Sequence, residues 1–334
     1  MRARRQRVRS AAGWAFALAV SVVLPVSVIA VVWVAAQIAR DQWVWSQCVF
    51  WVPAWVMFIV FAFAAWMARR SFGSRRPARA LFIALTVVTV WSAGRFLRHD
   101  VGWSPIAASV TADDVVITHW NPQWPGDNAL ACGRALAGVM GDVTIISGPG
   151  SMLRSAARDA WLPEGMRGVD LGVVAIVSRL PIIECRVLCR ESIARIGEVW
   201  LAWMVVQSPS GVLIRILVVD MPSAPWMARG HLANAVHEVL QRVALPAQPD
   251  IVLGDFNCTP GSVVIAELAN GCTPAPPWRA SGWLCTFERP WALLRIDQML
   301  AGARLEWRGY RTFDLGFSEH RAHQGVLAVP RGDR

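Results

Sequence analysis

The sequence predicts N-terminal transmembrane helices followed by one domain of mixed structure, an α/β (α+β) fold class. Three observations support this. Of the 334 residues, 55% are hydrophobic and only 17% are charged, which is too apolar for an ordinary soluble protein. The long apolar runs all lie before residue 98. After Asp114, short β-branched runs alternate with helical stretches. The length therefore accommodates a membrane anchor of residues 1–98, with two or three spans, and one large domain of residues 101–330.

Two apolar runs are long enough to cross a bilayer. Residues 13–39 follow a cluster of arginines and exceed the roughly 20 residues that a spanning helix needs. A cleaved signal peptide has a much shorter apolar core, so we interpret this run as a first span. Residues 48–67 form a second, with tryptophans near both ends, where indole rings favour the lipid headgroup level. Residues 80–94 form a third apolar run that is short for a span.

The arginine distribution predicts the orientation of these spans. Arginines are dense at the N-terminus and in the loop 68–79, and sparse in the loop 40–47. Positively charged loops stay on the cytoplasmic side. With three spans the domain lies outside the cytoplasm, and with two it lies inside. We expect three, although Arg95 and Arg98 lie beside the last run. The chain is thus predicted to be an integral protein of the inner or plasma membrane with an extracytoplasmic domain.

The positive charge is concentrated in the membrane anchor. Of the formal charge of +10, residues 1–100 contribute +11 and the rest contribute −1. Net charge therefore gives no indication of a broad nucleic-acid-binding surface on the domain. All 33 basic residues are arginines, which excludes a lysine Schiff base and a P-loop lysine.

Six of the seven cysteines lie after the predicted second span, which contains Cys48. An even number permits disulfides in an oxidising compartment, but small buried thiols are the favoured interpretation. Cys185 and Cys189 have a spacing known from zinc ligands. Because no matching pair follows nearby, a zinc site is not expected.

Strands and helices alternate along the predicted domain. We expect strands at 115–118, 143–147, 172–178, 199–207, 213–220 and 251–253, and helices at 128–140 and 226–243. Thr259 followed by Pro260 is typical of a helix N-cap with proline at the first helical position. No period of 20–50 residues recurs, which excludes a solenoid or propeller.

Four polar clusters each follow an apolar, strand-like run. They are His119-Trp-Asn121, Gly254-Asp-Phe-Asn257, Arg295-Ile-Asp297 and Ser318-Glu-His320. Taken singly, each has a plainer explanation, because Asp and Asn favour turns and helix caps. Loops at sheet ends bring such side chains into one cleft. Together the clusters supply carboxylate, amide and imidazole groups, which suit a hard cation such as Mg²⁺ that orients water against a phosphate.

These clusters, in this order, resemble the endonuclease/exonuclease/phosphatase family, which includes DNase I-like nucleases, neutral sphingomyelinases and inositol-phosphate phosphatases. Val-Ser-Arg-Leu-Pro181 resembles the family's strand followed by Ser-Arg-x-Pro, and Thr286 is similar to a residue of its late segment. The resemblance covers residues 113–329. It implies a DNase I-like two-layer β-sandwich flanked by helices, with a divalent-metal site for Mg²⁺ or Mn²⁺ at one end.

The resemblance also implies roles for four catalytic residues. Asp255 orients or deprotonates the attacking water, and Asn257 holds a phosphate oxygen as a substrate-binding residue. Asp297 hydrogen-bonds the imidazole of His320, which favours its charged form beside the developing phosphorane charge.

Two further residues are implied on the metal side, and here the chain departs from the family. Asn121 lies beside the metal and the phosphate, and Glu319 is a metal-side carboxylate. The family's principal metal ligand is a glutamate in a Gln-Glu pair, which is replaced here by Ser147-Gly148. Asp220 stands where the family has a histidine. It is either a partial replacement for the missing acid or simply a turn residue.

Two functions follow from these observations. The first is a membrane-anchored, divalent-metal-dependent phosphoesterase that hydrolyses phosphodiesters or phosphomonoesters at an atypical metal site. The alternative is a catalytically degenerate member that binds a phosphorylated ligand or partner. The lipid bilayer is one expected partner, and a phosphorylated small molecule, a lipid headgroup or a nucleic acid is the other. No specific protein partner is indicated.

A reporter enzyme that is active only outside the cytoplasm, fused after residue 100, is expected to be active, because three spans carry that point across the bilayer. A fusion within the arginine-rich loop 68–79 is the matched control and is expected to be inactive. Activity of a cytoplasm-only reporter after residue 100 would overturn the three-span assignment.

Overall fold

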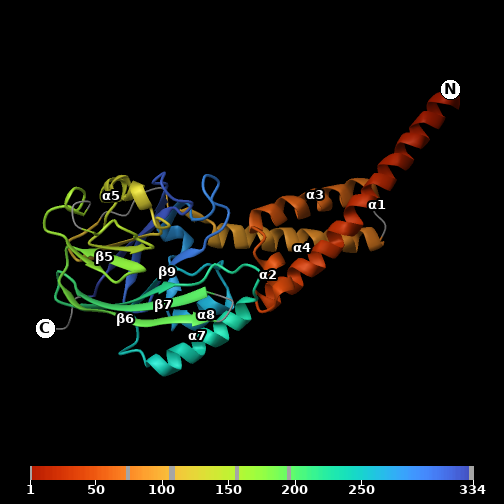
Figure 1. Cartoon of the computed structure of the whole chain (residues 1–334). Helices are drawn as coiled ribbons and strands as arrows, with labels where there is room; N and C mark the ends of the chain where they lie inside the picture. The colour runs from red at the N-terminus through yellow and green to blue at the C-terminus, as the bar shows by residue number, and fades with distance from the viewer. Residues whose placement is uncertain (1, 73–75, 105–109, 155–157, 194–196, 331–334) are drawn as a thin grey trace. The chain divides into compact units, whose positions relative to one another are not determined.

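The chain divides into two compact units, Met1–Leu97 and Arg98–Arg334, which are described separately. The computed structural model describes residues 2–72, 76–104, 110–154, 158–193 and 197–330. Figure 1 shows helices in the first unit, coloured red to orange, and strands together with helices in the second.

The helices of the N-terminal unit are α1 (Arg2–Ala39), α2 (Val44–Phe50), α3 (Ala54–Phe72) and α4 (Arg76–His99), the last ending just inside the second unit. Three of them contain segments long and apolar enough to cross a membrane, namely Val20–Ala39, Ala54–Ser71 and Arg79–His99. This agrees with the expected three spans. Residues 73–75 of the arginine-rich loop lie outside the described residues.

Two of the predicted span boundaries are wrong. The run 48–67 is not one helix, because the chain leaves the helical conformation after Phe50 and α3 begins at Ala54. Pro53 explains the break, since proline lacks the amide donor and disfavours a helical residue before it. The third candidate span is longer than 80–94, because α4 continues through Arg95 and Arg98.

The strands of the second unit form two sheets in the described residues. One has the order β1 (Val101–Trp103), β11 (Ala280–Trp283), β13 (Glu306–Phe313), β14 (Ala322–Ala328), β2 (Asp114–Trp120), β3 (Val143–Ser147), β5 (Val174–Ser178) and β4 (Arg167–Asp170). The other has the order β10 (Thr273–Pro274), β12 (Asp297–Ala301), β9 (Ile251–Asp255), β8 (Leu213–Asp220), β7 (Gly197–Gln207) and β6 (Ile182–Ile193).

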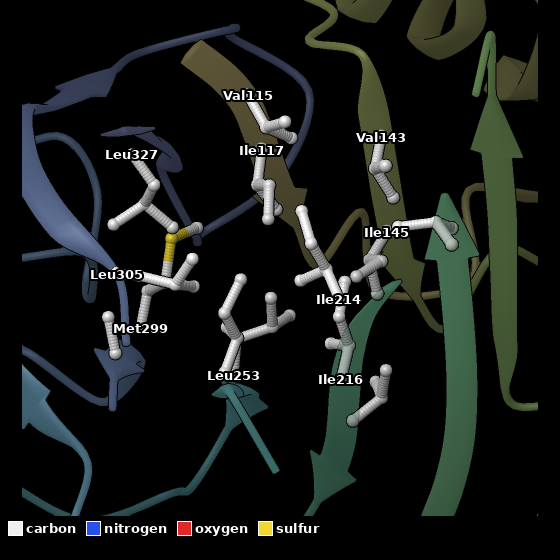
Figure 2. Close-up of a cluster of buried hydrophobic side chains, with 14 of the residues drawn as sticks. Val115, Ile117, Val143, Ile145, Ile214, Ile216, Leu253, Met299, Leu305 and Leu327 are labelled. Carbon is white, nitrogen blue, oxygen red and sulfur yellow. The ribbon is translucent and has the colours of Figure 1, made fainter. Parts of the chain in front are cut away.

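The two sheets pack face to face around one hydrocarbon core. Alternate residues of each strand point inward, as a period of two requires. Figure 2 shows Ile117 and Ile145 of one sheet opposite Ile216, Leu253 and Met299 of the other. The domain is therefore a mixed α/β sandwich, and the predicted fold class is confirmed.

Helices cover the outer faces. Helix α5 (Ala129–Ala137) packs through Cys132 and Leu136 on a second buried cluster that includes Trp120 and Ile146 of the eight-stranded sheet. Helices α7 (Arg229–Val243) and α8 (Val263–Ala269) pack against each other. Short 3₁₀ turns occur at η1 (Gly126–Asn128) and η2 (Pro277–Arg279).

The predicted N-cap at Thr259 is wrong. Helix α8 is capped by Ser262, whose hydroxyl accepts a hydrogen bond from the Val264 amide at 3.2 Å. Thr259 instead begins a turn in which its carbonyl accepts from the Ser262 amide. Gly261 has a φ of +87°, a left-handed conformation that cannot belong to the first turn of a right-handed helix.

All seven cysteines are free thiols. Four of them are buried, which fits the interpretation as small buried side chains: Cys132, Cys258, Cys272 and Cys285.

Gly325 on β14 packs closely against Met299 of the other sheet. A Cβ at this position would lie 2.6 Å from the sulfur of Met299 and 2.8 Å from the ring of Trp307. Gly325→Ala is therefore expected to lower the free energy of unfolding by about 1–3 kcal/mol through overpacking. Denaturant unfolding of the full chain in detergent measures this. Gly138→Ala, whose Cβ would meet only Ala135 oxygen at 3.6 Å, is the control. Equal stability of the two variants would contradict the close approach.

Candidate active site

Along the inner face of the six-stranded sheet, the side chains are hydrocarbon in the core and carboxylate at one end of the sandwich. Val218, Leu253 and Met299 are lateral neighbours on β8, β9 and β12, and all belong to the core. Two residues further along are Asp220, Asp255 and Asp297, again lateral neighbours. Laterally paired side chains point to the same face of a sheet. We call these three residues the carboxylate row.

The bend that follows β9 depends on Gly254 and Asn257. Gly254 has a φ of +140°, and a Cβ there would clash with the carbonyl oxygen of Val219 on β8, so only glycine fits. Asn257 is left-handed with a φ of +48°, which Asn tolerates better than most residues. Its amide donates to Asp255 Oδ1 at 2.9 Å. The Gly-Asp-Phe-Asn sequence thus fixes the Asp255 carboxylate from its own backbone.

An ion pair joins the carboxylate row to the loop before β14. His320 Nδ1 lies 2.9 Å from Asp297 Oδ2. Burial alone would lower the pKa of His320, but the charge and hydrogen bond of Asp297 outweigh it and raise the pKa to about 9. Burial alone would raise the pKa of Asp297, but the charge and hydrogen bond of His320 lower it to about 2. Thr286 Oγ1 accepts from the Asp297 amide at 3.1 Å and holds the strand in place.

In the other two members of the row, Asp220 and Asp255, the pKa is raised and not lowered. Burial, followed by repulsion from Asp297, raises the pKa of Asp255 to about 7. Asn121 Nδ2 donates to Asp255 Oδ2 at 2.9 Å. Burial, followed by the charges of Asp255 and Asp297, also raises the pKa of Asp220 well above its ordinary value. Like charges side by side in a poorly solvated row disfavour full ionisation.

A cleft of about 610 Å³ opens onto the row. Its lining includes five of the six side chains selected from the sequence: Asn121, Asp255, Asn257, Glu319 and His320. The sixth, Asp297, is fully buried behind His320. Asn257 Nδ2 is engaged with the Met221 carbonyl at 2.7 Å, and Glu319 is exposed. The structure thus brings all four polar clusters together.

Sequence reasoning missed several residues of the cleft. Glu198 lines it and accepts from Trp200 Nε1 at 3.0 Å and Arg190 Nε at 3.1 Å. Trp124, Trp200 and Phe287 line it too. None of these four lies in a polar cluster that follows a strand, so no sequence signal marked them. Asp220, for which two interpretations were open, lines the cleft at the end of β8.

A buried histidine network from the eight-stranded sheet faces the row. His119 Nε2 lies 3.1 Å from Ser147 Oγ, and its Nδ1 lies 2.8 Å from His323 Nε2. His323 Nδ1 contacts the Tyr310 hydroxyl at 3.0 Å. Burial lowers the pKa of His119 to about 4, and burial followed by His119 lowers that of His323 well below its ordinary value. Both rings are therefore neutral at pH 7, and His119 Nδ1 lies 3.9 Å from Asp297 Oδ1.

The donor atoms in the cleft suit Mg²⁺ or Mn²⁺. The amide of Asn121 and the carboxylates of Asp220, Asp255 and Glu319 line one cleft, and hard divalent cations take oxygen ligands. Donor atoms of Asp255, Asp297 and His320 also lie within 4.8 Å of one another. The charged His320 is already paired with Asp297, so the oxygen set fits a hard cation better.

No family model and no curated protein matches the chain. Several solved structures do. An endonuclease/exonuclease/phosphatase from Beutenbergia cavernae is 15% identical over 65% of this chain and 72% of its own, with a TM-score of 0.46. Another from Bacteroides vulgatus is 14% identical over 65% and 99%, with a TM-score of 0.46. A Neisseria 3′ phosphatase variant bound to a product DNA hairpin is 17% identical over 63% and 98%, with a TM-score of 0.45.

These matches are structures of the family that the sequence motifs resemble. Because each of these TM-scores lies below 0.5, the chemistry of the site is inferred from the chain's own side chains.

In the metal-free protein, His320 is expected to titrate near pH 9, and Asp297→Asn is expected to lower its pKa by about 1–3, because the opposing charge is removed. The pair stabilises the fold fully between about pH 4 and 6.5; this contribution is lost as the pH rises through about 9, where His320 loses its proton, and as it falls through about 2, where Asp297 gains one. NMR titration of ¹³C-labelled histidine measures the pKa. A wild-type His320 that titrates near 6.5 would contradict the buried ion pair.

Proposed function

We propose that the chain is a membrane-anchored, divalent-metal-dependent phosphoesterase with an atypical metal site. One observation carries the proposal: the charged Asp297–His320 pair lies beside Asp255 and Asn121 at a single cleft. These residues come from separate strand ends. A structural ion pair alone does not require the neighbouring carboxylate and amide groups in the same cleft.

Each residue of the cleft has its own role in phosphoryl transfer. His320, held charged by Asp297, places an N–H donor and a positive charge where negative charge develops on the phosphoryl oxygens. Asp255 has a pKa of about 7, so at neutral pH it accepts a proton from an attacking water or orients that water. Asn121 fixes the Asp255 carboxylate, and Asn257 lies beside it in the cleft.

Asn121, Asp255 and Glu319 are residues that would hold the cation. When bound, Mg²⁺ or Mn²⁺ would neutralise phosphoryl charge and lower the pKa of a ligated water.

The lining of the cleft favours a substrate with a single phosphoryl group over a polyanion. Among the residues that the structure describes, it includes four acids, Glu198, Asp220, Asp255 and Glu319, and no arginine. Tight binding of a nucleic-acid backbone depends on several cationic contacts, which this lining does not supply. Trp124, Trp200 and Phe287 add apolar surface. Of the expected ligands, a phosphorylated small molecule or a lipid headgroup therefore fits better than a nucleic acid.

The three apolar helices support the membrane location in this proposal. An inner- or plasma-membrane protein with an extracytoplasmic domain is the placement that the arginine distribution favours.

One observation favours the alternative, a domain that binds a phosphorylated ligand without hydrolysing it. Position 148, where the resemblance implies a metal-ligating glutamate, is a glycine. Loss of a carboxylate weakens the binding of hard cations.

Asp255→Ala and His320→Ala are each expected to lower hydrolysis of phosphodiester or phosphomonoester substrates by at least about 100-fold, since each removes a group acting in the transition state. The assay uses the full chain in detergent with Mg²⁺ or Mn²⁺, and EDTA is expected to abolish turnover. His237→Ala is the control, because His237 is exposed and pairs with Glu267 instead. Absence of turnover in the folded wild type would favour the binding alternative.

A further inference from the structure

The indole of Trp124 occupies the space beside Gly148, the position where the resemblance implies a glutamate. A Cβ at position 148 would lie 3.3 Å from Trp124 Nε1 and 3.4 Å from Asn121 Oδ1. Gly148 has a φ of +58°, which L side chains rarely adopt, and its carbonyl accepts from the Trp124 amide at 2.9 Å. A longer acidic side chain from this position would have to displace Trp124. The eight-stranded sheet therefore supplies no carboxylate from this point.

The six-stranded sheet carries the carboxylates instead. Asp220 and Asp255 are lateral neighbours on the parallel strands β8 and β9. Neighbouring strands lie about 4.8 Å apart, and paired side chains point to the same face, so both carboxylates project from one face of the sheet. Both also line the cleft. Two adjacent carboxylates on fixed strands form a preorganised pair of oxygen ligands.

The cleft-lining side chains that the structure describes do not balance the charge of the row. The row carries three carboxylates, and His320 is the one charged base among the cleft-lining residues that the structure describes. Its ion pair is made with Asp297. Asp220 and Asp255 are left side by side, so ionising both without a cation is unfavourable. A divalent cation would balance this pair.

The hydrogen bonds of the two carboxylates leave room for such a cation. In the described part of the chain, the side-chain carboxylate of Asp220 accepts no hydrogen bond, although Asp220 is partly buried. Asp255 accepts one bond on each oxygen, from Asn257 and Asn121. A carboxylate oxygen has two lone-pair directions, so each oxygen of Asp255 keeps one for a ligand.

We propose that Asp220 and Asp255 together hold the divalent cation of this chain, with Asp220 taking over the part of the absent carboxylate at position 148. This assignment rests on the proposed function and specifies its metal site. The six-stranded sheet thus contributes two ligands, at the ends of β8 and β9, to the cation site that Asn121 and Glu319 also line.

The test is Mn²⁺ binding to the full chain in nanodiscs of uncharged lipid, after EDTA treatment, followed by electron paramagnetic resonance of free Mn²⁺. Asp220→Asn is expected to lower the Mn²⁺ affinity by at least about 10-fold, since loss of even a second-shell group has that effect. Asp220→Glu, which keeps the charge, is expected to retain binding. Asp127→Asn, an exposed acid outside the cleft, is the matched control and is expected to bind as wild type.

Melting temperatures distinguish a ligand from a structural residue. Asp220→Asn is expected to raise or preserve the melting temperature of the metal-free protein, because it relieves repulsion from Asp255, and to abolish the rise that Mn²⁺ causes in the wild type. Wild-type Mn²⁺ affinity in Asp220→Asn would overturn the proposal. So would a wild type that binds no Mn²⁺, or a loss of binding accompanied by a lower metal-free melting temperature.

The outcomes separate this inference from the proposed function. His320→Ala is expected to bind Mn²⁺ as the wild type does while losing turnover. Hydrolysis that persists with unchanged Mn²⁺ affinity in Asp220→Asn overturns the metal assignment alone. Mn²⁺ binding that depends on Asp220 without any hydrolysis supports the metal assignment and contradicts the phosphoesterase.

Discussion

The burial of Asp255 and Asp297 in one lateral row with the partly buried Asp220, directly beyond a hydrocarbon core, is the constraint on which the rest of the site depends. Transferring an ionised carboxylate from water into such a place is strongly unfavourable unless it is paired and hydrogen-bonded. Asp297 meets this requirement through His320, and Asp255 through Asn121 and the Asn257 amide. Pairing and hydrogen bonding of these carboxylates therefore requires the loop before β14, the end of β2 and the turn after β9 to meet at one end of the sandwich.

The eight-stranded sheet places neutral polar side chains opposite this carboxylate row. His119 and His323 are lateral neighbours on β2 and β14, and burial keeps both uncharged at pH 7. A second charged histidine here would compete with His320 for Asp297. The chain thus has three buried histidines within one network, yet only one carries the positive charge, because only His320 makes a direct hydrogen bond to a carboxylate.

The sequence predicts the parts of the fold where local pattern and burial coincide. Strands β3 and β8 match the predicted 143–147 and 213–220, since their continuous β-branched runs are buried on both faces. Strand β6 was not predicted: at the edge of its sheet it carries charged residues such as Arg186 and Arg190, which hide the alternation. Nor was β13, whose polar residues, among them Glu306 and Arg308, have the same effect.

Some residues of the candidate site can likewise be predicted from the sequence, and others cannot. Asp255 and Asn257 follow a strand that local pattern reveals, and Asp297 and His320 come from short clusters whose order along the chain resembles a family. Glu198 and Trp124 enter the cleft only because strands and loops distant in sequence meet there. For Glu198, pairing between β7 and β8 sets Trp200 beside Asp220, and no local sequence pattern contains this pairing.

The boundary between anchor and domain follows from the same buried network. Arg295, two residues before Asp297, lies over the ring of Tyr310 at 5.0 Å and donates to the carbonyl of His99 at 3.1 Å. The Asp100 carbonyl accepts from the amide of Leu284 at 2.9 Å. His99 and Asp100 are therefore hydrogen-bonded to the rest of the domain, although the sequence pattern places its start at 101. A domain cut at 101 would lose an acceptor for a buried guanidinium next to the strand that carries Asp297. Such a loss costs about 1–3 kcal/mol or more for a charged group. His99, the last residue of the third apolar helix, thus contributes to the hydrogen bonding beside the candidate site.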